Sequence, residues 1–191
     1  MTSYKLQVKK GFTLVETLVA VLIFTVSILA LISLTATGVA DVGYVKNKLT
    51  ASYLAQEGVE MVRNIRDTDS IINNGGANAW NAFISHTSSC ASLSIPCQID
   101  GYTNPSEITI SECTNILKNI DFGCPLYYDY DSQTQIGSGY YKYKTSGAGE
   151  FTRLIIVQNI GNEVRIISKV FWKKGNTTYH VSFKENLTNW Q

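Results

Sequence analysis

Residues 9–16 read Lys-Lys-Gly-Phe-Thr-Leu-Val-Glu, and the 24 residues after them, 17–40, carry no charged side chain. At ~1.5 Å of rise per residue, this run makes about 36 Å of helix, which is enough to cross a bilayer core of roughly 30 Å. We therefore predict one transmembrane helix at about residues 12–40. Basic residues without any acid precede it, so the positive-inside rule keeps the N-terminus in the cytoplasm; they are Lys5, Lys9 and Lys10.

Glu16 interrupts the apolar pattern one turn inside this helix. A lone carboxylate costs up to ~3 kcal/mol at the bilayer centre and less near the interface. If the chain were cut after Gly11, Phe12 would become the N-terminus and carry an α-ammonium group. Phe12 and Glu16 are four residues apart and share one helix face. Their charges can therefore meet within one chain, or between neighbouring copies packed with an axial offset, which would fix the register of the helices.

The sequence KKG-FTLVE followed by an apolar helix resembles the prepilin cleavage and methylation motif of type IV pilins and type II secretion pseudopilins. The resemblance covers about the first thirty residues. It implies that a prepilin peptidase cuts between Gly11 and Phe12, that Phe12 is N-methylated, and that Glu16 guides filament assembly. Residues 55–67 (AQEGVEMVRNIRD) are similar to a stretch in PilV-like minor pilins and the pseudopilin I group, which favours a minor component over a major subunit.

Two other interpretations of the N-terminus remain. A secretory signal peptide also begins with lysines and an apolar stretch, and residues 38–40 (Gly-Val-Ala) have the small-x-small pattern of a signal peptidase site. However, the apolar segment exceeds the usual ~7–15 residues of such a peptide and has Glu16 near its start. A signal anchor fits the length but gives no reason for the Gly-Phe pair before Glu16. The pilin interpretation accounts for all of these features.

The charge balance does not favour general nucleic-acid binding. The 191 residues include 16 basic and 15 acidic ones, for a formal net charge of +1. Loss of residues 1–11 removes three lysines and leaves 13 basic and 15 acidic residues, for a net charge near −2. A local basic patch stays compatible with this total. The 45% hydrophobic content suits one domain plus a membrane helix.

Four cysteines follow the membrane segment, on the side predicted to be oxidising: Cys90, Cys97, Cys113 and Cys124. An even number there indicates two disulfides, with three connectivities open. We favour Cys90–Cys97 with Cys113–Cys124, because short loops close most easily. Zinc is the competing use, but the spacings lack the paired C-x-x-C signature of zinc sites.

The rest of the chain predicts an α+β, pilin-like fold. After a leader at residues 1–11, one helix is expected over residues 12–67, its second half packing on an antiparallel sheet. Apolar residues recur there in steps of three and four: Val42, Val45, Leu49, Tyr53, Leu54, Met61, Val62 and Ile65. The opposite face is polar: Lys46, Lys48, Gln56, Glu60 and Arg63.

Residues 68–125 are rich in Gly, Asn, Ser and Pro and predict a surface-loop region pinned by the cysteines, with a short helix at 111–119. If the resemblance holds, partner contacts belong to this region. Residues 126–191 predict an antiparallel meander with one face on the helix and the other in solvent. The expected strands are 126–131, 139–145, 151–160, 163–173 and 177–187.

We find no constellation of catalytic residues. His86 and His180 lack ligand-like spacing, and His180 falls on the polar side of its strand. The acid pairs at 67–69 and 129–131 lack the length and the glutamate of a calcium loop and are interpreted as turn acids. The tyrosines between 127 and 143 are interpreted as half-buried sheet packing and not as a stacking platform. We expect no enzyme activity, no cofactor and no metal.

The expected function is structural: a minor pilin or pseudopilin of a type IV pilus or type II secretion-like filament. Its partners would be other pilin subunits, the prepilin peptidase, the inner-membrane assembly machinery and, before assembly, membrane lipid. The protein would cross the inner membrane once, with its N-terminus inside, and then join an extracytoplasmic or cell-surface filament. The alternative is a binding module displayed by the same helix, such as an adhesin or DNA-uptake subunit.

Overall fold

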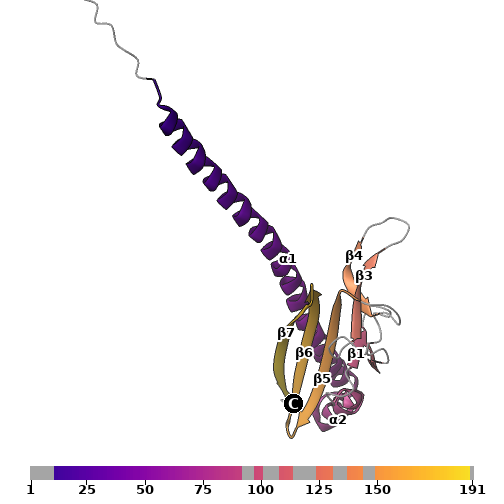
Figure 1. The fold of residues 1–191 in the computed structure, drawn as a ribbon. Coiled ribbons are helices and arrows are strands. Elements are labelled where there is room, and N and C mark those ends of the chain that lie inside the picture. The colour runs from indigo at the N-terminus through magenta and orange to yellow at the C-terminus, as the bar shows by residue number, and fades with distance from the viewer. Residues whose placement is uncertain are drawn as a thin grey trace, which may run out of the picture. The chain divides into compact units, whose positions relative to one another are not determined.

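The structure is a computed structural model that describes residues 11–91, 97–100, 108–113, 124–130, 137–143 and 149–189. The chain divides into two compact units, residues 1–45 and 46–191. The predicted α+β class is confirmed, because a long N-terminal helix precedes a seven-stranded antiparallel sheet (Figure 1). The elements are α1 (Leu14–Ile72), α2 (Gly76–His86), η1 (Ser88–Cys90), β1 (Cys97–Asp100), β2 (Thr109–Glu112), β3 (Cys124–Tyr130), β4 (Gly137–Tyr143), β5 (Phe151–Ile160), β6 (Glu163–Lys174) and β7 (Thr177–Thr188).

Specific residues determine where α1 begins and where it ends. At the start, Thr13 Oγ1 accepts a hydrogen bond from the Glu16 N–H at 3.3 Å, which is an N-cap interaction. At the end, Asn74 has a φ of 55°, the positive φ that stops helices. Gly75 follows with φ 73° and ψ −169°, a backbone conformation open almost only to glycine. The helix was expected to end at residue 67 and ends at Ile72, because the Asn-Asn-Gly-Gly segment, and not the acids before it, supplies the stop signal.

Within the second unit, α1 buries small and medium-sized side chains against the sheet: Ala51, Leu54, Ala55, Val59, Val62 and Ile65. Part of the predicted apolar face is wrong, because Leu49 and Tyr53 are 54% and 69% exposed. Val42 and Val45, in the first unit, are exposed as well. The buried face is set by alanines and Gly58, which let the helix backbone come close to the strands. The larger apolar residues at 49 and 53 lie outside it.

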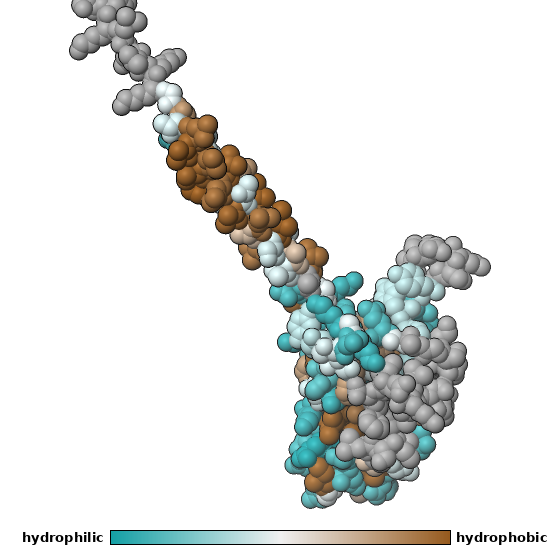
Figure 2. All heavy atoms as spheres, in the orientation of Figure 1, coloured by the Kyte–Doolittle hydropathy of each residue, from teal (hydrophilic) through white to brown (hydrophobic). Residues whose placement is uncertain are grey.

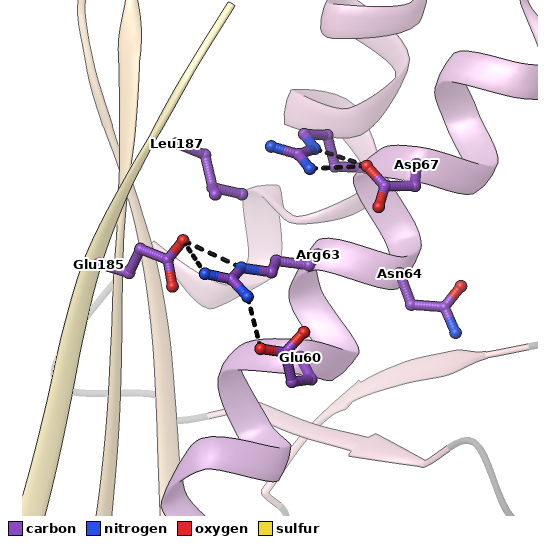
Figure 3. A pocket seen from close by; sticks show the side chains of 7 residues that line it. Glu60, Arg63, Asn64, Asp67, Glu185 and Leu187 are labelled. Atoms are coloured by element: carbon purple, nitrogen blue, oxygen red, sulfur yellow. Dashed lines mark hydrogen bonds and ion pairs between the residues drawn. The ribbon is translucent and has the colours of Figure 1, made fainter.

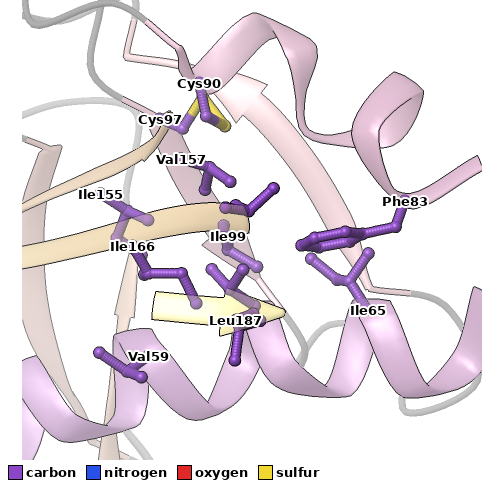
Figure 4. Close-up of a cluster of buried hydrophobic side chains, with 12 residues drawn as sticks. Val59, Ile65, Phe83, Cys90, Cys97, Ile99, Ile155, Val157, Ile166 and Leu187 are labelled. Carbon is purple, nitrogen blue, oxygen red and sulfur yellow. A yellow bond between two sulfur atoms is a disulfide. The ribbon is translucent and has the colours of Figure 1, made fainter. Parts of the chain in front are cut away.

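β5 is the central strand of the sheet. Its pairing with β6, and that of β6 with β7, form the predicted meander (Figure 1). On its other edge β5 pairs with β1 at Cys97↔Ile155 and with β3 near Phe151. The β3–β4 hairpin thus joins the sheet through β3, although β4 precedes β5 in the chain. The hydrophobic core lies between β5–β7 and α1, with α2 contributing Phe83 (Figure 4).

The face of the sheet turned away from α1 was expected to be exposed to solvent. This expectation is wrong for β5 and for the middle of β6, where Leu154, Ile156 and Phe171 form a second buried cluster with Ile167 packed against it. The reason is visible in β5, in which every residue from Phe151 to Val157 is buried. A strand with apolar residues at both parities indicates burial on both faces and not on one.

The predicted loop region at 68–125 contains regular structure. α2, η1, β1 and β2 all fall within it. In α2, Ala79 and Phe83 are four residues apart and form its buried stripe. Of the short helix expected at 111–119, Ser111 and Glu112 belong to strand β2, and residues 114–119 lie outside the described residues.

Gly58 is expected to be intolerant of substitution. A Cβ atom built there would lie 2.5 Å from Ser168 Oγ on β6 and 3.3 Å from atoms of Arg153 and Ile155. Gly58→Ala should therefore lower the free energy of unfolding, since a steric cost of about 1–3 kcal/mol exceeds the gain of ~1 kcal/mol in helix propensity. The measurement is urea unfolding of the full chain in detergent.

Ser168→Ala provides the matched control for Gly58→Ala. The Ser168 hydroxyl is buried and has no hydrogen-bond partner among the described residues, so its removal should cost little. The double variant Gly58→Ala/Ser168→Ala should recover most of the stability lost by Gly58→Ala. Equal stability of Gly58→Ala and the wild type would show that the helix and sheet are not in tight contact at this point.

Candidate functional site

The N-terminal segment is the first candidate site. Gly11, Phe12 and Thr13 precede α1 and are not helical. Phe12 is 79% exposed, and the peptide bond between Gly11 and Phe12 lies in this non-helical stretch. Glu16 is in the first turn of α1, where the positive end of the helix dipole favours an acid. An enzyme that cuts extended peptides could reach this bond without unwinding the helix.

α1 is long and apolar enough to cross a membrane. Figure 2 shows hydrophobic side chains along the visible face of its first part, and the large apolar side chains there are exposed in the isolated chain. The hydroxyl groups in this run donate hydrogen bonds to carbonyls one turn back: Thr25 Oγ1 to Leu22 O (2.9 Å), Ser27 Oγ to Ile23 O (2.7 Å) and Thr35 Oγ1 to Leu31 O (2.7 Å). These polar groups are satisfied inside the helix, as an apolar surrounding requires.

Residues 6–36 match the prokaryotic N-terminal methylation motif. The matched range includes Gly11, Phe12 and Glu16, and with the long apolar helix it is consistent with a type IV pilin-like protein. The motif together with the apolar helix indicates membrane anchoring and processing by a prepilin peptidase. It also implies a structural subunit that assembles with other pilins. No curated protein and no solved structure matches this chain.

The four cysteines of this pilin-like chain form two local disulfides. Cys90 is bonded to Cys97 and Cys113 to Cys124, with Cα–Cα distances of 5.2 and 5.5 Å. This is the pairing favoured by loop length. Each disulfide ends at the first residue of a strand, because Cys97 begins β1 and Cys124 begins β3. All four residues are buried. Cys90–Cys97 joins η1 to β1, and Cys113–Cys124 joins the residue after β2 to the start of β3, while β1 and β3 each pair directly with β5.

Arg153, on β5, is the main functional or structural residue that sequence reasoning missed. It is 1% exposed and faces α1. Its Nη1 forms an ion pair with Glu57 Oε2 at 2.9 Å and donates to the Leu54 carbonyl at 3.0 Å. Its Nε donates to the Tyr143 hydroxyl at 2.6 Å. One guanidinium thus connects α1, β4 and β5. An arginine inside an apolar strand sequence was the available signal.

The Tyr143 hydroxyl should make folding sensitive to alkali. Burial raises the pKa of this phenol above its ordinary value of 10.0, and the positive charge of Arg153 offsets only part of the rise. The folded protein therefore holds this proton more tightly than the unfolded chain does. Its contribution to stability is fully present below about pH 10 and is lost as the pH rises through the folded-state pKa.

We expect the urea midpoint of the wild type to fall as the pH rises above about 10, and to fall less steeply for Tyr143→Phe, which has no phenolic proton. Burial raises the pKa of Tyr141 as well, so some decline should remain in this variant. Parallel pH profiles for the two proteins would contradict the assignment to Tyr143.

A second ionic cluster joins α1 to β7 (Figure 3). Arg63 forms ion pairs with Glu60 on its own helix and with Glu185 on β7. These residues line an open hollow of about 620 Å³ together with Asn64, Arg66, Asp67 and Leu187. Arg66 is paired with Asp67, so each of the two arginines and three acids that line the hollow has an ion-pair partner. The cluster holds helix and edge strand together and offers no unpaired charge to a ligand.

The remaining candidate residues form ordinary structural contacts. His86 Nδ1 lies 2.9 Å from Asp69 Oδ2 and connects the end of α2 to the last turns of α1. Asp69 is therefore a buried helix residue and not a turn acid. Asp129 pairs with Lys142 across the β3–β4 hairpin at 3.1 Å. Among the described residues, no cluster of His, Cys, Asp or Glu could hold a metal ion.

The tyrosines of the β3–β4 hairpin form a row of edge-to-face contacts. The ring of Tyr141 contacts Phe151 at 5.5 Å and Tyr128 at 5.3 Å, and Tyr128 contacts Tyr130 at 5.1 Å. Exposure rises along this row, from buried Phe151 to Tyr130, which is 66% exposed. Tyr141 is half-buried and packs in the sheet, whereas Tyr130 is largely exposed to solvent.

Proposed function

We propose that the protein is a minor pilin or pseudopilin of a type IV pilus or type II secretion-like filament. The observation that carries the proposal is the match at residues 6–36, which includes the Gly11–Phe12 bond and Glu16. The non-helical conformation of residues 11–13 and the exposed apolar surface of α1 support it. The similarity of residues 55–67 to minor components favours a minor subunit.

In this proposal α1 has two successive environments. Before assembly, its apolar first part lies in the inner membrane. Cleavage after Gly11 by the peptidase gives Phe12 an α-ammonium group, which the same enzyme methylates. That group and the Glu16 carboxylate then neutralise each other within the chain or between adjacent copies, which lowers the cost of an acid in an apolar surrounding. Helix packing and burial drive the transfer of the subunit from lipid into the filament.

The test is the mass of the intact protein and of its N-terminal peptide, recovered from the native membrane or surface fraction. The expected chain begins at Phe12 and has one added methyl group. A chain that retains residues 1–11 would instead support a signal-anchored binding module. A chain that begins near Asp41 would indicate a cleaved signal peptide. Either of these results would refute the filament-subunit proposal.

A further inference from the structure

The face of the β6–β7 hairpin turned away from α1 has a row of basic side chains. Successive positions of a strand alternate between its two faces. On β6 the residues at 165, 169 and 173 therefore share this face, because Val164, Ile166 and Val170 are buried toward the helix. The register places Lys184 opposite Ile167 and His180 opposite Phe171. The row, named here the basic row, consists in order of Arg165, Lys184, Lys169, His180 and Lys173.

The basic row has an even spacing. Its members stand at every second position along β6, alternately on β6 and on β7. At ~3.4 Å per residue, each step is about 6.8 Å and the whole row about 27 Å long. Lys169 is half-buried and the other four side chains are exposed. Figure 2, in the orientation of Figure 1, shows hydrophilic side chains over β6 and β7 on this face.

The charges of the basic row are not neutralised locally. None of its four Lys and Arg side chains forms an ion pair with another residue that the structure describes. Glu163 stands at one end, where Asn186 bridges it to Arg165. The other nearby acid, Glu185, is turned toward α1 and bonded to Arg63. A chain whose mature form is near −2 in net charge therefore concentrates positive charge on one sheet face.

Phe171 lies on the same face as the basic row, but it is buried and packs against members of the row, so it offers no stacking surface. Phe171 is 7% exposed, its ring lies 4.6 Å from Lys169 Nζ, and its centroid lies 5.8 Å from that of His180. Proteins that bind single strands stack successive bases on exposed aromatic rings, and the imidazole of His180 is the single exposed aromatic ring among the five residues of the basic row. Contacts from this face would therefore be made to a charged backbone.

We propose that the basic row binds the phosphate backbone of duplex DNA without reading its sequence. At ~3.4 Å per base pair along the axis, the row of about 27 Å spans about eight base pairs of a duplex. Lysines and arginine supply backbone contacts that position a duplex but carry no sequence information. This inference goes beyond the proposed filament function and does not depend on it, since processing at Gly11 can be measured separately.

The test uses the full chain in neutral detergent and a labelled duplex of about 20 base pairs, whose ~68 Å length exceeds that of the row. Three to four phosphate contacts predict a slope of log affinity against log salt of about −2.7 to −3.6. Affinity should then fall about 40- to 150-fold between 50 and 200 mM salt. Absence of binding at the lower salt concentration would overturn the proposal.

Two double variants that lose the same charge distinguish an effect of the basic row on binding from an effect of net charge. Lys169→Gln/Lys184→Gln removes two central members of the row and should lower affinity at 50 mM salt at least about tenfold and flatten the salt slope by about 1.8. Lys46→Gln/Lys48→Gln removes the same charge from α1 and should change neither. An equal loss in both variants would overturn the proposal, as would binding of a sulfated polysaccharide in preference to the duplex. The disulfides and circular dichroism of each variant establish that it is folded.

Discussion

Replacing Arg153 with methionine is expected to lower the free energy of unfolding by about 3 kcal/mol. Loss of one member of a buried ion pair typically costs about 3–5 kcal/mol, because the other charge is left uncompensated. Glu57 keeps 23% side-chain exposure, so water relieves part of that penalty and the lower end of the range applies. The Leu54 carbonyl and the Tyr143 hydroxyl would lose donors in the same substitution.

The measurement is urea unfolding of the full chain in detergent with both disulfides intact. Arg165→Met is the control, since it removes an exposed arginine from the neighbouring strand and should change stability by no more than about 0.5 kcal/mol. Adding Glu57→Leu to Arg153→Met removes the carboxylate that has lost its arginine partner and should restore a large part of the lost stability. Wild-type stability of Arg153→Met would mean that the ion pair does not hold α1 on the sheet.

Glu16→Gln is expected to reduce the amount of mature protein in the filament fraction at least about tenfold, while leaving cleavage at Gly11 intact. A tenfold effect corresponds to ~1.4 kcal/mol, which is well within the ~3 kcal/mol that a lone charge can cost inside a bilayer. The substitution leaves the Phe12 ammonium without a counter-charge. The peptide bond at which we propose cleavage lies before Phe12 and is unchanged.

Quantitative immunoblots of sheared filament and membrane fractions measure this effect. Asp41→Asn is the control: it removes an acid at the other end of the uncharged run and should assemble like the wild type. Wild-type amounts of Glu16→Gln in filaments would refute the assembly role of the carboxylate. If Glu16→Gln were not cleaved, the Glu16 carboxylate would instead be needed for recognition by the peptidase.

The strands of the last third could be predicted from sequence because local signals define them. β5 begins and ends at the predicted residues 151 and 160, and tight turns follow it at Gly161 and separate β6 from β7 at Gly175, both with positive φ. The methylation motif is likewise a short local pattern. The structure also pairs the cysteines as short loop closure favours.

The features that sequence reasoning missed depend on distant parts of the chain. Whether Tyr53 or Ala55 faces the sheet cannot be decided from helical periodicity, because both belong to apolar stripes and only the strands select one of them. In the sequence, Arg153 is a lone charge inside an apolar strand, and its ion pair forms only because the fold brings Glu57, 96 residues earlier, beside it. α2 was not predicted, because its region is rich in Gly and Asn, although Ala79 and Phe83 have the four-residue spacing of a helix face.

The local pairing of the cysteines also determines how the domain can oxidise during export. In the proposed topology, with the N-terminus in the cytoplasm, the cysteines reach the oxidising compartment in the order 90, 97, 113 and 124. Partners are only 7 and 11 residues apart, so Cys90 can close with Cys97 before Cys113 emerges. The order of emergence therefore yields the native connectivity directly. No wrong pair has to be opened again, and the slow reshuffling of disulfides, which takes seconds to hours, is avoided.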